Sequence, residues 1–210
     1  QKVKMKELEL IQKVGKLAKF AFVRQNSPKG DGHAVLCAAP FIGADEPVAV
    51  LFGDDIITHK IPAIGQLMKV YEKYGDPVCA VQEVPHNDVS RYGVIGGIET
   101  GKNTWEIKKF VEKPKVEDAP SNLAVVGRYI ITPEILRILA TQEPGKDGET
   151  RLADAFGTHL ASGKTMYGCK FDGRRYDCGN KLQFIIAQIE LGLAHPEVKD
   201  DLAAYLKTLE

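Results

Sequence analysis

Two neighbouring carboxylates, Asp54 and Asp55, come directly after an apolar run, residues 47–52. The run is typical of a buried strand, and Gly53 lets the backbone turn sharply where the strand ends. In open α/β sheets, ligands collect beyond the carboxyl ends of the strands. Paired carboxylates at that place suit a hard cation such as Mg²⁺. The alternative is a turn whose aspartates cap the next segment and bind no ligand.

A third carboxylate, Asp177, lies between a strand-like run, residues 164–171, and the start of a helix for which Asn180 is a candidate N-cap. Two aspartates from separate strand ends can converge on one ion, and the positive end of the helix would favour anions nearby. The alternative is a structural role, in which Asp177 pairs with Arg174 or Arg175. The spacing leaves both interpretations open.

Gln25 ends a strand-like segment, residues 19–25, and a loop rich in Pro and Gly follows it, leading to a helix expected from His33. A glutamine amide offers both a donor and an acceptor, which matches the edge of a pyrimidine. A glycine-rich turn exposes backbone N–H and C=O groups to the same ligand. The loop lacks the lysine pattern of a Walker motif, so an ordinary loop is the alternative.

Glu112 and Lys113 form a charged pair directly before Pro114. Pro114 ends the strand and predicts an extended conformation for Lys113. An acid that accepts hydrogen bonds from sugar hydroxyls, beside an ammonium that contacts phosphate, would suit a sugar phosphate. A solvated charged pair before a turn is the alternative.

Strand-like and helix-like segments alternate along the chain. The expected strands are residues 19–25, 47–52, 77–84, 123–131 and 164–171. Helices are expected after Pro62, from Thr132 and Pro133, after Asn180, and within residues 199–210. An antiparallel hairpin that turns at Gly101 is expected within residues 93–114. The alternation predicts one α/β domain with a mixed, mostly parallel sheet flanked by helices.

Composition limits the possible functions. The 210 residues are 44% hydrophobic, which supports a sizeable core and one domain, residues 1–210. Lys plus Arg and Asp plus Glu both total 28, so no basic excess is present to bind nucleic acid. No apolar run approaches the roughly 20 residues of a membrane helix, and no signal-peptide pattern opens the sequence. We therefore predict a cytoplasmic protein that binds neither nucleic acid nor membrane.

Six segments together resemble one family. They are VRQNSPKGDGHAVLCA, VLFGDDII, RYGVI, FVEKP, SNLAVVGRYIITPEI and RRYDCGNKLQFI. Their order and spacing, from about Phe22 to Pro196, are similar to those of bacterial UTP:glucose-1-phosphate uridylyltransferases. The resemblance implies a Rossmann-like nucleotidyltransferase fold that joins UTP and glucose 1-phosphate into UDP-glucose and pyrophosphate, with Mg²⁺ as cofactor. It also implies a homo-oligomer, either a dimer or a tetramer.

The resemblance assigns roles on the nucleotide side of the site. It implies that Gln25 and the backbone of Gly30 recognise uracil. Asp54 and Asp177 would hold Mg²⁺ against the phosphates, and both are therefore candidate catalytic residues. Asp55 becomes the lesser partner, which supports the loop rather than binding the metal.

On the sugar side, the resemblance implies that Gly93, Glu112, Lys113 and the backbone near Val125 hold the glucosyl phosphate. Lys113 would also be catalytic, because its charge would hold the attacking phosphate. In-line displacement of this kind depends on positioning and charge neutralisation and needs no covalent nucleophile.

The sequence also departs from the family pattern. The family's glycine-rich loop after the first strand, with an arginine and a later lysine that contact the triphosphate, is not found in these residues. A chain without this strand and loop is expected to be a poor catalyst. Asp31 stands where the family often has an apolar residue, and we expect its side chain to point out to solvent. Thr150, Arg151 and Ala153 also differ from the family pattern, and their effect on the site is left open.

Two other functions remain as alternatives. One is a non-catalytic nucleotide-sugar-binding subunit that keeps Gln25, Glu112 and Lys113 but does not turn over. The other is a nucleotidyltransferase for another base or sugar, such as a thymidylyltransferase. Contacts to the edge of the base decide which nucleotide is used. Competition among UTP, dTTP and CTP therefore distinguishes a uridylyltransferase from an enzyme for another base.

Overall fold

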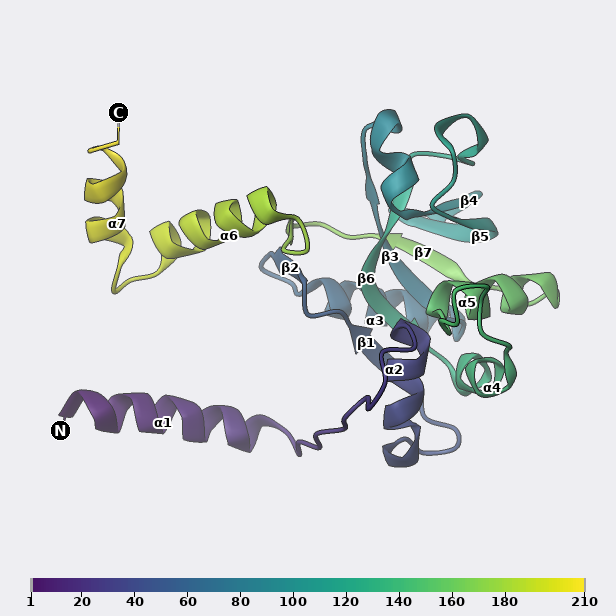
Figure 1. Cartoon of the computed structure of the whole chain (residues 1–210), viewed down its shortest axis with the longest axis horizontal. Coiled ribbons are helices and arrows are strands. Elements are labelled where there is room, and N and C mark those ends of the chain that lie inside the picture. The colour runs from purple at the N-terminus through teal and green to yellow at the C-terminus, as the bar shows by residue number, and fades with distance from the viewer. Residues whose placement is uncertain (1, 210) are drawn as a thin grey trace.

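The computed structural model describes residues 2–209 and contains one mixed sheet with helices on both faces (Figure 1). The strands lie side by side in the order β1 (Val48–Leu51), β6 (Leu123–Ile131), β3 (Val78–Glu83), β7 (Tyr167–Lys170), β5 (Thr104–Glu112) and β4 (Gly93–Gly101). A separate antiparallel ribbon pairs β2 (Asp55–Thr58) with β8 (Arg174–Asp177).

The prediction of a mostly parallel sheet is wrong. Within residues 2–209, β3 and β7 form the parallel pair of this sheet, and its other pairings are antiparallel. The alternation of strands and helices correctly brings β1 and β3 into one direction, since both run antiparallel to β6. However, β6 comes later in the chain and inserts between them. The hairpin expected to turn at Gly101 is confirmed as β4 and β5.

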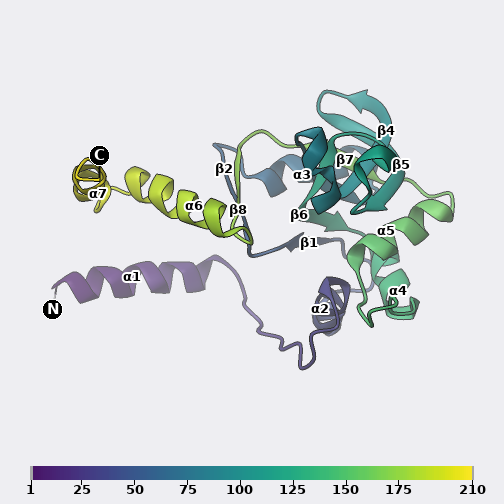
Figure 2. The same cartoon turned by 45° about the horizontal axis from the view of Figure 1, so that its top comes forward.

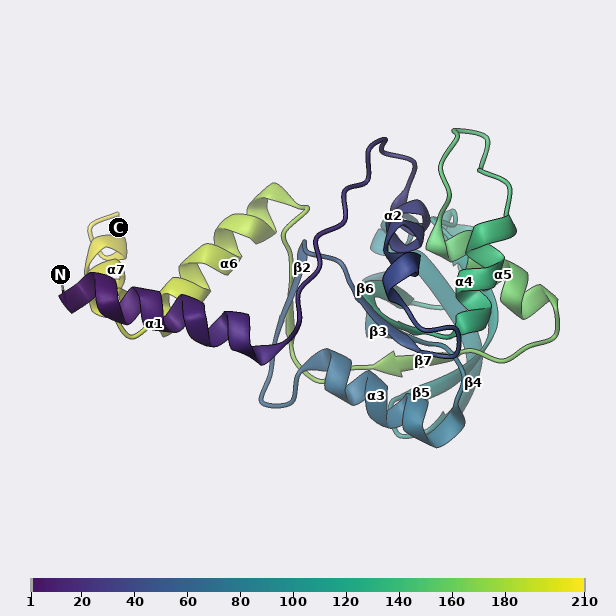
Figure 3. The ribbon, with the colours of Figure 1, turned by 90° about the horizontal axis from the view of Figure 1, so that it is seen from below.

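Helices cover both faces of the sheet. On one face, α2 (Asp31–Ala38), α4 (Pro133–Thr141) and α5 (Leu152–Ala161) pack against side chains of the central strands. On the other face, α3 (Ala63–Tyr74) packs against β3, β6 and β7. Figure 3 shows the sheet between these two layers. The core therefore fixes the strand ends that carry the candidate site.

Local sequence signals explain where three helices begin or end. At the start of α6 (Lys181–Ala194), the Asn180 side chain accepts hydrogen bonds from the backbone N–H groups of Leu182 and Gln183, which confirms it as an N-cap. α4 starts at Pro133 as expected, although Thr132 makes no capping bond through its side chain. α3 ends at Gly75, which adopts a left-handed conformation with φ +76°.

Residues 19–25 form no strand, so that prediction is also wrong. The segment runs as extended coil between α1 (Lys2–Leu17) and α2, and Phe20 and Phe22 are exposed. A strand needs a neighbour to satisfy its backbone groups, and within residues 2–209 no strand pairs with this segment. Apolar alternation therefore indicated a strand without showing which strand would pair with it.

Helices α1, α6 and α7 (Lys199–Leu206) project from the body on one side (Figures 1 and 2). Three short 3₁₀ helices complete the fold: η1 (Ala39–Phe41), η2 (His86–Arg91) and η3 (Val116–Asp118). Gln1 and Glu210 of the expected domain, residues 1–210, lie outside the described residues. No helix within residues 2–209 has the length and apolar character needed to cross a membrane.

Candidate active site

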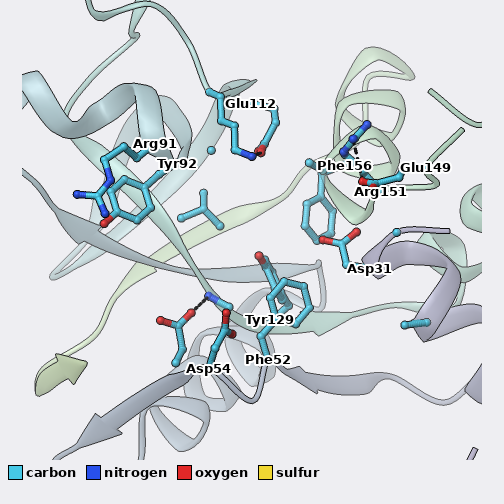
Figure 4. Close-up of a pocket in the computed structure, with 18 of the residues that line it drawn as sticks. Asp31, Phe52, Asp54, Arg91, Tyr92, Glu112, Tyr129, Glu149, Arg151 and Phe156 are labelled. Atoms are coloured by element: carbon cyan, nitrogen blue, oxygen red, sulfur yellow. Dashed lines mark hydrogen bonds and ion pairs between the residues drawn. The ribbon is translucent and has the colours of Figure 1, made fainter. Parts of the chain in front are cut away.

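The residues to which the sequence assigns a role surround one pocket of about 650 Å³. They are Gln25, Gly30, Asp54, Asp55, Gly93, Glu112, Lys113, Val125 and Asp177. Figure 4 shows Asp54 on one wall with Phe52 and Tyr129, Glu112 across the pocket, and Asp31 beside Arg151 and Phe156. Segments far apart in the sequence thus converge on one polar pocket.

The carboxylates of Asp54 and Asp177 lie beside each other at the end of the β2/β8 ribbon. A Cβ built on Gly179 would be 3.3 Å from Asp54 Oδ2 and 3.2 Å from Asp177 Oδ1, so both oxygens border the same point. The backbone N–H of Cys178 donates to the carbonyl oxygen of Asp54 over 2.7 Å, which joins the two loops. The two carboxylates fit a hard cation that keeps water or phosphate oxygens as its other ligands.

This donor set does not form a closed metal cage. Among residues 2–209, no group of three or more His, Cys, Asp or Glu side chains is arranged to hold a metal ion. A cation at Asp54 and Asp177 would therefore need oxygen ligands from elsewhere, such as the phosphates of a bound nucleotide. This open coordination is what a site of phosphate chemistry requires.

Asp55 is buried, in contrast to the exposed Asp54, and its carboxylate contacts protein groups. Its Oδ2 accepts a hydrogen bond from the backbone N–H of Gly127 over 2.8 Å, and its Oδ1 accepts from Arg175 Nε. Gly127 is free to make this bond because the pairing of β3 with β6 shifts in register and leaves it without a partner in β3. Arg128 holds the same loop by donating to the carbonyl oxygen of Phe52. The geometry therefore gives Asp55 a supporting position.

Asp177 makes the structural contact that its spacing allowed, and one of its oxygens remains on the Asp54 side. Its Oδ1 faces the Asp54 side, whereas its Oδ2 lies 3.6 Å from Arg175 Nη2. The structural ion pair is with Arg175, because Arg174 pairs with Glu190 instead. The structural contact with Arg175 therefore leaves the second oxygen of Asp177 on the side of Asp54.

Gln25 and Gly30 come together in the loop before α2. Gln25 Nε2 donates to the carbonyl oxygen of Gly30 over 2.9 Å and lies 2.9 Å from His33 Nδ1. Thr150 anchors the loop, since its N–H donates to the carbonyl oxygen of Lys29 over 2.8 Å and its own carbonyl accepts from His33 N. The segment before α5 therefore holds the loop in place.

The expectation that Asp31 points away to solvent is wrong. Its side chain is exposed, but it lies in the pocket wall (Figure 4). Asp31 Oδ1 accepts a hydrogen bond from the N–H of Leu152, the first residue of α5, over 2.9 Å. A carboxylate is stabilised at a helix N-terminus, and this contact draws the side chain inward.

We predict that Gly30→Ala disrupts this loop far more than a matched glycine substitution. A Cβ at Gly30 would lie 2.5 Å from the Thr150 carbonyl oxygen, and the residue has φ +94°. Gly148 has φ +81° with nothing within 4 Å, so Gly148→Ala carries only the conformational cost, about 1–2 kcal/mol. Thermal unfolding of the two variants measures the difference. An equal loss of stability would show that crowding at Thr150 does not matter.

On the opposite wall, Glu112 stands over Gly93. A Cβ on Gly93 would be 2.9 Å from Glu112 Oε2, so a side chain at this position would displace the carboxylate. Lys113 Nζ lies 3.9 Å from Glu112 Oε1, and the Lys113 N–H donates to the carbonyl oxygen of Tyr92 over 3.0 Å. Desolvation raises the pKa of Glu112, an effect that the charge of Lys113 opposes and that of Asp31 reinforces.

Lys113 is not extended, in contrast to the prediction. Its φ is +45°, in the left-handed region that non-glycine residues rarely adopt. The preference set by Pro114 is overridden here, and the N–H of Lys113 turns back to Tyr92. Backbone outliers of this kind are found where a functional side chain must be aimed.

Sequence reasoning missed the aromatic and basic residues that line the pocket. They are Phe52, Arg91, Tyr92, Phe110, Tyr129, Phe156 and Arg175. The Tyr129 ring contacts Phe52 and Phe156 at centroid distances of 5.4 and 5.5 Å, and its hydroxyl points into the pocket (Figure 4). Burial raises the pKa of Tyr129 well above its usual value, so the hydroxyl stays a hydrogen-bond donor.

A signal for Tyr129 was present in the sequence. Val125, Gly127 and Tyr129 follow one another at a spacing of two along β6, and all three line the pocket. Because side chains at this spacing share one face of a strand, the prediction for Val125 could have been extended to Tyr129. No comparable pattern marks Arg175, which enters the site from the separate ribbon.

The carboxylate pair, the glycine-containing loop and the polar pocket form an arrangement that can hold nucleotide phosphates through a divalent cation. The comparison with protein families specifies the class. A family profile described as "Nucleotidyl transferase" matches residues 2–191. The chain belongs to this nucleotidyl transferase family.

Individual relatives agree with the family. A UTP–glucose-1-phosphate uridylyltransferase of Staphylococcus haemolyticus (strain JCSC1435) is 48% identical over 96% of this chain and 69% of its own length. The enzyme of that name from Bacillus subtilis (strain 168) is 43% identical over 100% of this chain and 71% of its own. The crystal structure of a UDP-glucose pyrophosphorylase complexed with UDP-glucose superposes with a TM-score of 0.81 at 38% identity, covering 99% of this chain and 74% of that one.

Proposed function

We propose that the protein joins UTP and glucose 1-phosphate to give UDP-glucose and pyrophosphate. The supporting observation is the convergence of Asp54 Oδ2 and Asp177 Oδ1 on one point of a pocket that Gln25 and Glu112 also line. The relatives that share this chain's sequence carry the name of this activity. Together they favour uridylyl transfer over a simple binding role.

In the reaction, a phosphate oxygen of glucose 1-phosphate attacks the α-phosphorus of UTP. A new P–O bond forms there as the bond to the bridging oxygen of the β-phosphate breaks, and that electron pair leaves with pyrophosphate. No side chain forms a covalent bond in this step. The residues act through positioning and charge.

Each wall of the pocket has a proposed task in this reaction. The amide of Gln25 and the backbone of Gly30 hold the uracil edge. Glu112 accepts hydrogen bonds from sugar hydroxyls, whereas the ammonium of Lys113 holds the phosphate of glucose 1-phosphate. Gly93 and the backbone near Val125 let the sugar approach closely.

Mg²⁺ is the cation we propose for Asp54 and Asp177. When bound, it would neutralise negative charge on the phosphates of UTP. The carboxylate pair supports this choice because Mg²⁺ prefers oxygen ligands and keeps waters or phosphate oxygens. Activity with Mg²⁺ and its loss in the presence of a chelator, restored by added Mg²⁺, would support the assignment.

The direct test is incubation of the full-length protein with UTP, glucose 1-phosphate and Mg²⁺, followed by separation of the products. The expected result is UDP-glucose and pyrophosphate in equal amounts. Competition with dTTP and CTP tests the base, and preferential use of dTTP would favour a thymidylyltransferase. Calorimetric binding of UDP-glucose without any turnover would instead favour a non-catalytic binding subunit.

The raised pKa of Glu112 predicts a pH effect. Ionised Glu112 accepts from sugar hydroxyls, so binding of glucose 1-phosphate weakens as pH falls through the Glu112 pKa, which lies above its usual range. Asp31→Asn removes a charge that raises this pKa, so the acid limb of kcat/KM for glucose 1-phosphate should move to lower pH. Asp118→Asn, in η3, is the control because Asp118 does not act on Glu112.

Ionisation of glucose 1-phosphate does not account for a difference between variants. Its phosphate has a second pKa of roughly 6, which is the same in assays of the parent, Asp31→Asn and Asp118→Asn. A limb that stays in place in Asp31→Asn would contradict the assignment of the acid limb to Glu112.

Three broader predictions accompany this function. We propose a homo-oligomer, dimer or tetramer, supported by apolar side chains that are exposed on the projecting helices α1 and α6. Sedimentation velocity tests this state, and a monomer at all concentrations would contradict it. A cytoplasmic location and the absence of nucleic-acid binding stay predictions from the sequence.

A further inference from the structure

Arg175 joins the two sides of the candidate metal site. Its side chain is only 10% exposed, and its Nε donates to Asp55 Oδ1. Its Nη2 lies 3.6 Å from Asp177 Oδ2, and its guanidinium carbon is 5.5 Å from the ring centroid of Tyr92. A guanidinium can satisfy several such partners at once because its donors are fixed in a planar fork.

These contacts divide the two oxygens of Asp177 between two directions. Oδ2 faces Arg175, whereas Oδ1 faces the point that it shares with Asp54 Oδ2 near Gly179. If the Asp177 side chain turned about its Cα–Cβ bond, its carboxylate would leave that point. The contact with Arg175 therefore selects the orientation in which Asp177 can share a cation with Asp54.

The charge of Arg175 is largely balanced by Asp55. The guanidinium, which arginine keeps protonated in proteins, forms its nearer ion pair with the Asp55 carboxylate and a longer one with that of Asp177. The ion pair of Arg175 and Asp55 has no net charge. Its repulsion of a nearby cation is accordingly weaker than that of a lone guanidinium, and a variant that removes both charges separates this effect from orientation.

We propose that Arg175 is a positioning residue for nucleotidyl transfer, which holds Asp177 so that its free oxygen faces Asp54 and a divalent cation. This inference deepens the proposed function and rests on its carboxylate pair. Partners that orient metal ligands in this way typically contribute about 10- to 100-fold in metal affinity or activity.

The test measures binding of Mn²⁺, a stand-in for Mg²⁺ with a similar preference for oxygen ligands. Free Mn²⁺ is quantified by electron paramagnetic resonance in the presence of UDP-glucose, for the parent and for Arg175→Gln. The matched control is Arg174→Gln, because Arg174 precedes Arg175 in the same strand but is 59% exposed and pairs with Glu190. We expect Arg175→Gln to weaken Mn²⁺ binding by about 10-fold or more and Arg174→Gln to leave it unchanged.

A second variant separates orientation from charge and from folding. Arg175→Gln leaves Asp55 buried without its ion pair, which can destabilise the fold. The double variant Asp55→Asn with Arg175→Gln removes both charges, so the net charge is unchanged and an acceptor remains for the Gly127 N–H. The same weakening of Mn²⁺ binding is expected in the folded double variant. Arg175→Lys keeps the charge but lacks the fork, so it should give an intermediate value.

The outcomes distinguish this inference from the proposed reaction. Parent-like or tighter Mn²⁺ binding by the double variant would overturn the role of Arg175, as would equal weakening in Arg174→Gln. A parent that fails to bind Mn²⁺ would overturn both the carboxylate pair and this inference. A parent that binds Mn²⁺ but makes no UDP-glucose would overturn only the proposed reaction.

Discussion

Asp54→Asn should lower kcat for UDP-glucose formation by about a thousandfold, equivalent to ~4 kcal/mol in the activation barrier. The amide keeps the size of the side chain but removes the charge that would attract a divalent cation. Asp54 is exposed and forms none of the ion pairs found within residues 2–209, so its loss should leave the fold intact. The rate is measured at saturating UTP and glucose 1-phosphate.

The dependence on Mg²⁺ makes this result specific. If Asp54 binds the cation, raising the Mg²⁺ concentration should recover part of the rate of Asp54→Asn, because weaker binding is offset by mass action. Asp172→Asn is the control, since Asp172 is an exposed carboxylate outside the pocket, in the turn between β7 and β8. An Asp54→Asn variant that retains most of the parent rate would contradict the metal assignment.

The supporting role of Asp55 gives a contrast between neighbours. Asp54 projects into the pocket, whereas Asp55 is buried between Gly127 and Arg175. The apolar run and Gly53 predicted the position of both carboxylates, but spacing alone could not make them unequal. Asp55 differs from Asp54 because it accepts from the Gly127 N–H, which has no partner in β3. That free N–H results from the strand register and not from the sequence near Asp54.

Most strand positions were predictable because hydrophobic periodicity is local, although residues 19–25 form no strand. Residues 47–52, 77–84 and 123–131 contain β1, β3 and β6, within a residue or two at each end. Their directions were not predictable in the same way. The insertion of β6 between β1 and β3 depends on pairing between distant segments, about which periodicity carries no information.

Side-chain directions were the least predictable feature. Asp31 turns inward because the N-terminus of α5, more than a hundred residues later, offers it a backbone N–H. The sequence identifies Arg175 only as one of two arginines that can pair with Asp177. Its burial depends on contacts with Asp55 and Tyr92, which are distant in the sequence. Such contacts require the assembled fold.

Lys113→Met should reduce kcat/KM for glucose 1-phosphate by about a hundredfold, or ~2.7 kcal/mol, the value of a charge-assisted contact to phosphate. Met keeps the apolar stem and removes the ammonium of a side chain that is 66% exposed beside Glu112 and available to a ligand. The KM for UTP should change little, because Lys113 lies on the wall opposite Asp54. Lys115→Met, in the same loop and exposed, is the control.

The pH profile of the same variant provides an independent check on the pairing of Lys113 with Glu112. The charge of Lys113 lowers the pKa of Glu112, against the desolvation that raises it. Removing that charge lets the pKa rise further, so the acid limb of Lys113→Met should move to higher pH, opposite to the shift expected for Asp31→Asn. Shifts of the same sign in both variants would show that the limb does not report Glu112. Opposite shifts of the acid limb would show that Lys113 and Asp31 both act on the Glu112 carboxylate. They would exclude two surface charges that act independently of each other.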